Sequence, residues 1–463
     1  MSKRQEESRL GSESIWKVVL SLAIPTMLAQ FVNVLYSIVD RIYIGNMPGI
    51  GDLALAGVGI CGPIVTLLAS FGSLVGLGGA PLMAIRLGEQ NRKGARQIVA
   101  NSFILLTGLS VILTIAVFLL KNDLLHWFGA SRTLYPYANE YLTWYAAGTL
   151  FSILSTGLNS FIICQGFGKI GMFTVMIGAI SNIVLDPVFI FAFGLGVKGA
   201  AIATVLSQFF SAGFALKFLC GRYTIVRITL RGYSLKIMRR ILLLGLSPFL
   251  IIATDSIMLL ALNGILQKYG GTDSDNLIAA ATIMLSFMQI VTLPMGGITG
   301  GTQPVLSYNY GAGNSARVKK GEACILAICL AFTVIMFLAA RFASVYFVKI
   351  FTSDNTLIAM SVKYIKIYTL AIIPLAVQYT FVDGLTALGI APAAISLSLF
   401  RKIAVMMTLT FLLPRFYGVE AVFYAEPIAD AISAVSSASV FLLLIGKILR
   451  KRERVLCKAP SSV

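Results

Sequence analysis

Four polar side chains recur at helical spacing inside the first long apolar segment, which runs from about residue 15 to residue 44. Separations of 3, 4 and 3 residues place them on one face of a helix: Gln30, Asn33, Ser37 and Asp40. A carboxylate at bilayer depth costs on the order of 2.5–3.5 kcal/mol, so this face is expected to meet a partner or a water-filled cavity. Asp40 is therefore the first candidate for a working residue.

Three later apolar segments add polar positions to the same half of the chain: Asn159, Asn182, Asp186, Thr204 and Gln208. Asn182 and Asp186 are four residues apart and share a helix face. Two carboxylates, an amide and a hydroxyl suit a hard monovalent cation such as Na+. The two carboxylates equally suit one proton, because burial and mutual repulsion favour the neutral form of one of them. Both alternatives stay open.

The composition is that of a membrane protein, with 57% hydrophobic residues, 12% charged residues and a mean hydropathy of +0.87. Apolar runs of roughly 20 residues each span a bilayer as one helix. Twelve such runs predict an all-α integral membrane protein: 15–44, 53–83, 98–120, 137–163, 170–193, 198–220, 240–267, 277–305, 320–345, 360–388, 392–414 and 420–447.

Lysine and arginine are distributed unevenly over the loops between these runs. With both termini inside, the inner segments hold 25 of them and the outer loops hold 8. The positive-inside rule therefore predicts cytoplasmic termini in a bacterial inner membrane. The basic residues are scattered over short loops instead of gathering on one surface with aromatics, so nucleic acid is not an expected partner.

A shift of 223 residues superposes the chain on itself. Identical residues then coincide along much of its length, for example Pro25 with Pro248, Pro81 with Pro304, and Gly88 with Gly311. This duplication predicts two six-helix lobes of the same orientation, related by a pseudo-two-fold axis along the membrane normal, with a substrate cavity between them. The predicted divisions are a cytoplasmic tail (1–14), a first lobe (15–220), a cytoplasmic linker (221–239), a second lobe (240–447) and a second cytoplasmic tail (448–463).

The second lobe has its own acids, which allow two interpretations. Glu426 and Asp430 are four residues apart and either contact substrate or pair with Arg401 and Lys402 of the neighbouring span, which need partners in a membrane. The further cavity candidates are one tyrosine, one methionine and two acids: Tyr36, Met288, Asp255 and Asp383.

Glycine and proline gather at the end of the second span of each lobe, in 76–81 and 296–304. These runs indicate either close helix packing through small residues or a flexible helix end that moves.

Taken together, several motifs resemble those of the multidrug and toxic compound extrusion (MATE) family over about residues 14–447. They are the span-one proline with Asp40 downstream, the Gly/Pro-rich end of span two followed by Arg-Leu-Gly, Gln165-Gly, and Asn182-x3-Asp186-Pro187. The resemblance implies a first-lobe cation site at the four positions that match archaeal members: Asp40, Asn182, Asp186 and Thr204. Some members of the family couple cations through acids of spans seven and ten, where Asp255 and Asp383 lie.

The resemblance implies a secondary-active exporter of amphipathic, often cationic compounds that works by alternating access in antiport with H+ or Na+. A lipid-linked saccharide flippase of the same superfamily is the alternative, although such proteins often have fourteen spans and a more basic cavity. A membrane-embedded enzyme is not expected, because the sequence has no metal-ligand cluster or nucleophile motif, and an ATP-driven pump would need a Walker A pattern. Cofactors and bound metals other than Na+ are not expected, and the expected state is a monomer.

Overall fold

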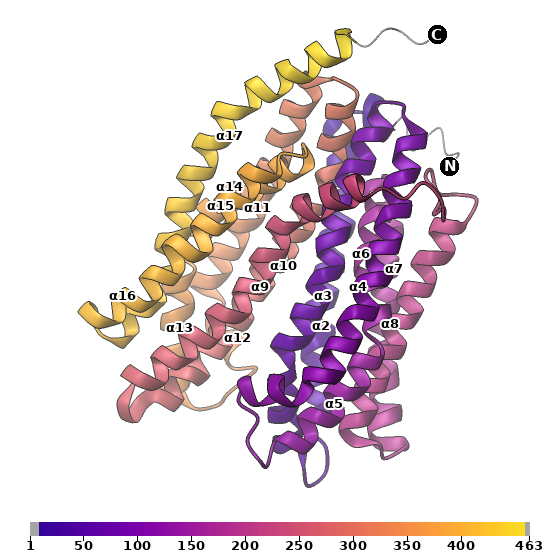
Figure 1. Cartoon of the computed structure of the whole chain (residues 1–463). Coiled ribbons are helices and arrows are strands. Elements are labelled where there is room, and N and C mark those ends of the chain that lie inside the picture. The colour runs from indigo at the N-terminus through magenta and orange to yellow at the C-terminus, as the bar shows by residue number, and fades with distance from the viewer. Residues whose placement is uncertain (1–8, 459–463) are drawn as a thin grey trace.

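The computed structural model describes residues 9–458, which form long helices joined by short loops (Figure 1). The first lobe consists of α2 (Ile15–Gly45), α3 (Gly51–Gly88), α4 (Arg92–Trp127), α5 (Tyr135–Ala147), α6 (Thr149–Cys164), α7 (Gly168–Pro187), the π-helical turn η1 (Val188–Ala192) and α8 (Gly196–Cys220). The second lobe consists of α9 (Leu235–Tyr269), η2 (Gly271–Asp273), α10 (Ser274–Gly311), α11 (Ser315–Phe342), α12 (Ser344–Val348), α13 (Asn355–Tyr368), α14 (Ile372–Ala387), α15 (Ala391–Leu399), η3 (Phe400–Met407), α16 (Thr408–Tyr417), η4 (Val419–Tyr424) and α17 (Ala425–Lys458).

Ten of the described helices are long and apolar enough to cross a bilayer singly, and two bent pairs bring the number to twelve. The twelve predicted spans are thus confirmed, but two of them are not continuous. The segment predicted over 137–163 bends by 56° between α5 and α6, and the one predicted over 360–388 bends by 49° between α13 and α14. Gly148 lies at the first bend, and the 223-residue shift carries it to Ala371 at the second. Both lobes therefore break at the same point of the repeat.

Several helices continue past the ends of the apolar runs, because polar and basic turns extend them outside the apolar layer. Helix α9 begins at Leu235, within the linker predicted over 221–239, and α17 continues through Lys458, within the predicted tail 448–463. Residues 1–8 and 459–463 of the two predicted tails lie outside the described residues.

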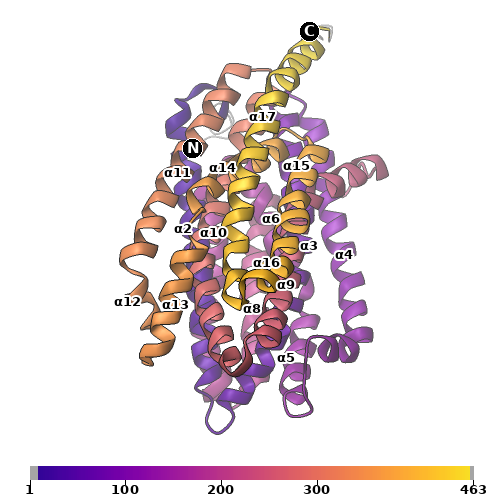
Figure 2. The same cartoon turned by 90° about the vertical axis from the view of Figure 1, so that its left-hand side faces the viewer.

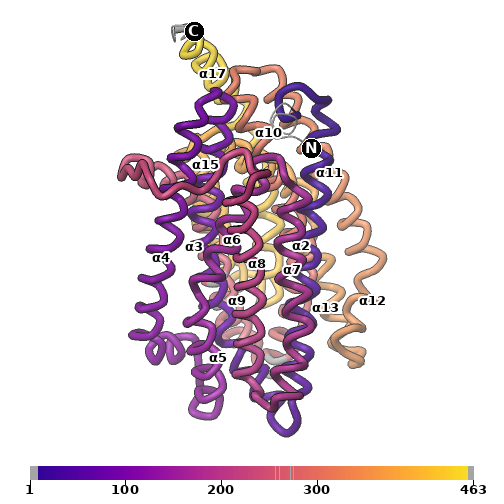
Figure 3. Tube along the Cα trace, turned by 90° about the vertical axis from the view of Figure 1, so that its right-hand side faces the viewer, coloured from indigo at the N-terminus to yellow at the C-terminus, as the bar shows by residue number. Residues whose placement is uncertain are grey.

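The two lobes approach each other at the end where both termini lie and diverge toward the opposite end (Figure 1). We call these the termini end and the open end. Figure 2 shows the second lobe with α17 in front, and Figure 3 shows the first lobe with α6, α7 and α8 in front. The helices of the two lobes are therefore farther apart at the open end than at the termini end.

Glycines permit the close approach at the termini end. A Cβ added to Gly245 of α9 would lie 1.7 Å from the carbonyl oxygen of Leu74 in α3, and one added to Gly88 of α3 would lie 2.0 Å from that of Tyr308 in α10. Such distances are far inside van der Waals contact, so no other residue fits there without displacing a backbone. In the Gly/Pro-rich run of α3, Gly78 packs equally closely against α9. The structure therefore has the close packing expected of these small residues.

Candidate functional site

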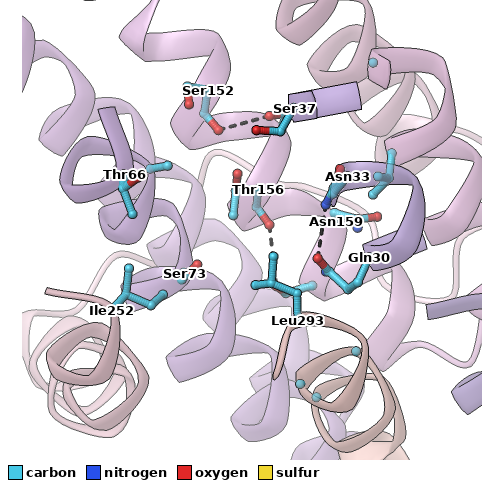
Figure 4. Close-up of a pocket in the computed structure, with 18 of the residues that line it drawn as sticks. Gln30, Asn33, Ser37, Thr66, Ser73, Ser152, Thr156, Asn159, Ile252 and Leu293 are labelled. Carbon is cyan, nitrogen blue, oxygen red and sulfur yellow. Dashed lines mark hydrogen bonds between the residues drawn. The ribbon is translucent and has the colours of Figure 1, made fainter. Parts of the chain in front are cut away.

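A cavity of about 770 Å³ lies between the two lobes. Its wall is formed by α2, α3 and α5–α8 of the first lobe, and by α9, α10 and α14 of the second. Figure 4 shows the hydroxyl groups of Ser152 and Thr156 on one side, with Ile252 and Leu293 of the second lobe facing them. One cavity wall is thus rich in polar groups and the opposite wall is more apolar, as an amphipathic ligand requires.

The polar face of α2 lines this cavity along its length. Gln30, Asn33, Tyr36, Ser37 and Asp40 all belong to its wall. The amide of Asn33 donates to Oε1 of Gln30 over 3.1 Å, which is visible in Figure 4. The helical spacing of the sequence therefore places these side chains where a ligand between the lobes would meet them.

Asp40 is joined in the first lobe by a buried group of polar side chains. Asn182 and Asp186 are 1% and 0% exposed, and Nδ2 of Asn182 lies 3.2 Å from Oδ1 of Asp186 and 3.4 Å from Oγ1 of Thr204. The carboxyl of Asp40 is close enough to that of Asp186 for the two groups to interact. The four side chains expected to form one site, which come from α2, α7 and α8, are therefore together.

Three oxygens of this group are buried and accept no hydrogen bond from the described residues: Oδ1 of Asp40, Oδ1 of Asn182 and Oδ2 of Asp186. Buried acceptors are rarely left without a partner, because each costs free energy when it is removed from water. A carboxyl, an amide and a second carboxyl with free oxygens suit a small monovalent cation or a shared proton. The geometry thus fits both alternatives that the residue types allow.

Two tyrosines of α5 complete this wall, although sequence reasoning did not single them out as site residues. Tyr141 and Tyr145 line the cavity with their rings stacked at 6.2 Å between centroids. The hydroxyl of Tyr145 lies 3.1 Å from that of Ser152 and accepts from Nε2 of Gln208 over 3.3 Å. The sequence offers one signal, since the 223-residue shift carries both tyrosines to tyrosines, Tyr364 and Tyr368, but tyrosines in an apolar span are equally typical of core packing. The remaining predicted first-lobe residue, Asn159, also lines the cavity.

The second-lobe acids separate into two groups. Glu426 and Asp430 do not belong to the cavity wall. Both accept from the guanidinium of buried Arg401, whose Nη2 lies 2.7 Å from Oε1 of Glu426 and 2.7 Å from Oδ1 of Asp430. Their prediction as substrate contacts is corrected in favour of charge pairing, because a buried guanidinium needs anionic partners.

Met288 is also absent from the cavity wall, contrary to its prediction as a pliable contact. It is 5% exposed and packs in an apolar cluster of the second lobe. The position of a methionine along a helix does not show whether its side chain faces the core or the cavity, because an apolar side chain fits both surroundings.

Asp255 and Asp383 do line the cavity. Asp255 forms an ion pair with Lys402, whereas Asp383 accepts from the hydroxyl of Thr299. The cavity wall therefore contains three carboxyls, from Asp40, Asp255 and Asp383, and one guanidinium, from Arg41.

Comparison with known proteins agrees with this architecture. The family model MatE matches the chain twice, over residues 25–188 and 249–412, so that the two matched stretches follow the internal repeat. The multidrug export protein MepA of Staphylococcus aureus (strain MSSA476) is 23% identical over 433 residues, which cover 93% of this chain and 94% of that protein. MepA of Staphylococcus saprophyticus is 24% identical over 437 residues, with the same coverage of both chains.

A solved structure described as the outward-facing conformation of a multidrug resistance MATE family transporter has the same fold, with a TM-score of 0.89 and 23% identity over 95% of this chain and 98% of that one. Because the family model covers more than half of the sequence and recurs with the repeat, the chain is a multi-pass membrane protein that belongs to the MatE family.

Proposed function

We propose that this protein is a secondary-active transporter that exports amphipathic, often cationic organic compounds across a bacterial cytoplasmic membrane in antiport with H+ or Na+. The relatives named as multidrug export proteins support the class of substrate. The observation that carries the proposal is the cavity of about 770 Å³ between the lobes. Asp40 and many amide and hydroxyl groups line its first-lobe wall, whereas the second-lobe wall is more apolar and contains Asp255 and Asp383.

The cavity chemistry favours cationic compounds over a lipid-linked saccharide. Three carboxyls and one guanidinium line it, which is the opposite balance from the one that would hold a pyrophosphate group. Asp255 already has Lys402 as its partner, so Asp40 and Asp383 are the acids left to attract a positively charged ligand.

Coupling is assigned to Asp40 and Asp186. When an ion or proton occupies their shared site, the negative charge that attracts a cationic substrate is neutralised. When the site is empty, that charge is available again. Ion and substrate therefore bind with negative coupling, and the ion gradient drives release of the substrate on the side where the ion enters.

The direction of transport follows from orientation. With the 25 basic residues of the inner segments placed in the cytoplasm, the termini end is cytoplasmic and the open end faces outward. The conformation described above is then the outward-facing state, in which substrate leaves and the coupling ion enters. Closure at the open end and opening at the termini end give the opposite state.

The test is transport into inverted or reconstituted vesicles with a fluorescent organic cation. Na+ and H+ gradients are imposed separately, with the membrane potential clamped. Accumulation driven by one gradient and abolished by its collapse is the expected result, and it identifies the ion. Equal accumulation without any gradient, or none under either gradient with correctly inserted protein, would refute antiport.

A further inference from the structure

A buried glutamate lies in the second lobe outside the groups described above. Glu322 is in the third turn of α11, is 5% exposed and does not line the cavity. Its Oε1 is buried and has no hydrogen-bond partner among the described residues. A charged side chain so placed in an apolar helix costs several kcal/mol unless it is paired or neutral, so it requires an explanation.

The carboxyl group of Glu322 points at α14, beside the cavity acid Asp383. A Cβ added to Gly384 would lie 2.4 Å from Oε1 of Glu322 and 2.9 Å from Oε2. Glycine at this position therefore lets the carboxyl rest against the backbone of α14, one residue beyond Asp383. Asp383 in turn lines the cavity and accepts from Thr299. The two acids are therefore neighbours across α11 and α14, with Asp383 in the cavity wall and Glu322 behind it.

No lysine or arginine among the described residues forms an ion pair with Glu322. Asp255, Glu426 and Asp430, in contrast, each pair with a cationic side chain. The titratable groups that interact with it are Asp383 of α14 and Cys329 of its own helix. Lys319 and Lys320 begin the same helix but are exposed and form no ion pair with it.

Helix α10 packs against this part of α11 with apolar side chains. A Cβ added to Gly321, the residue before Glu322, would lie 3.2 Å from Leu306 and 3.4 Å from Val305. With only acids for charged neighbours, a proton is the cation that these surroundings can accommodate at Glu322.

We propose that Glu322 and Asp383 form a second proton-binding site, in which Glu322 holds the proton and Asp383 exchanges it with the cavity. In this exchange a proton leaves the carboxylic acid of Glu322, Asp383 accepts it and then releases it to cavity water, and Glu322 remains as a carboxylate until it is protonated again. A neutral Glu322 allows Asp383 to be ionised and to attract a cationic ligand, because two adjacent charges would repel. The role in transport rests on the proposed function, whereas the proton on Glu322 does not.

Infrared spectroscopy of the full-length protein in lipid tests the proton directly. We expect the wild type at neutral pH to have a carbonyl-stretch band from a protonated carboxyl that is lost in Glu322→Gln. Glu420→Gln is the matched control, since Glu420 is an exposed glutamate of the same lobe paired with Lys363 at 2.6 Å. That control should retain the band. Identical bands in the wild type and Glu322→Gln would overturn the proposal.

A second variant tests the proton site even if Glu322→Gln folds poorly. Gly384→Ala retains both carboxyls but pushes a methyl group against Glu322, so the band should shift in frequency. Gly264→Ala adds the same methyl group where nothing lies within 4 Å and should leave the band unchanged. A carboxylate spectrum at neutral pH that responds to Na+ and not to pH would assign a metal cation to this site and exclude the proton.

The transport assay separates this proposal from the proposed function. Normal gradient-driven export with no Glu322 band refutes the proton site alone. A Glu322 band in a protein that shows no export under any gradient refutes the antiporter and leaves the proton site standing. If both hold, Glu322→Gln should change the pH dependence of export at constant protein abundance.

Discussion

The guanidinium of Arg452 forms an ion pair with the carboxylate of Glu89 over 2.7 Å and joins the last helix of the second lobe to the turn after α3 of the first. Arg452 also donates to the carbonyl oxygens of Tyr310 and Gly311, over 3.1 and 2.6 Å. Both partners are mostly buried, at 13% and 16% side-chain exposure. This contact bridges the lobes at the termini end, so it must break if that end opens.

Glu89→Gln is therefore expected to favour opening of the termini end. Hydrogen bonds to charged groups contribute about 1.5–3 kcal/mol, so the ratio of the two conformations should shift by roughly 10- to 100-fold. Distances between spin labels across the termini end would measure the shift. Glu420→Gln removes an exposed ion pair within one lobe and should leave the distances unchanged, and equal effects of the two variants would contradict a bridging role.

The close packing of α3 on α9 leads to a second prediction about the termini end. Gly245→Ala places a Cβ 1.7 Å from the carbonyl oxygen of Leu74, so the helices must separate for the lobes to close there. Overpacking of this kind costs about 1–3 kcal/mol. Cross-linking of cysteine pairs across the termini end should fall in this variant and persist in Gly264→Ala. Unchanged cross-linking would show that α9 can shift without separating the lobes.

The first-lobe acids should behave as a single unit. Asp40→Asn and Asp186→Asn are each expected to abolish gradient-driven export at normal membrane abundance, and the double variant should be no worse than either single one. Residues that serve separate functions would instead give partial losses that add. Export is to be normalised to inserted protein, because loss of Asp186 from a buried position can also lower abundance.

Asp430→Asn should have a different kind of phenotype. It removes one partner of Arg401, which is 2% exposed, and breaking a buried pair costs about 3–5 kcal/mol. Lower abundance and a lower thermal midpoint are expected, with the ion dependence of the remaining protein intact. A triple variant that also carries Arg401→Met and Glu426→Gln removes all three charges and should recover stability. Loss of ion dependence at full abundance would move coupling to the second lobe.

The sequence predicted the twelve spans, the repeat and the polar face of α2, because each depends on a residue spacing or a segment length that can be measured along the chain. It did not predict the bends at Gly148 and at Ala371, since nothing in hydropathy distinguishes a bent span from a straight one. The pairing of Glu426 with Arg401 stayed open for the same reason: four-residue spacing fixes which face two acids share, but not which helix that face meets.

Glu322 was not among the predicted site residues. In the sequence, a single acid beside Lys319 and Lys320 near the start of a helix is typical of a solvated residue at the end of a span. In the structure, the Glu322 side chain is buried where α11 packs against Gly384 of α14. Such contacts depend on how α11 and α14 pack, which lies beyond any pattern within one helix.

If Asp40 and Asp186 form the coupling site, the coupling ion and a cationic substrate must oppose each other's binding. The affinity of purified protein for a fluorescent organic cation, measured as a function of pH at fixed Na+ and of Na+ at fixed pH, tests this opposition. We expect wild-type affinity to fall as the concentration of the coupling ion rises, and Asp40→Asn to bind the cation with an affinity independent of both ions. A wild-type affinity that does not change with either ion, or an Asp40→Asn affinity that changes with the ions as the wild type's does, would contradict coupling at Asp40 and Asp186.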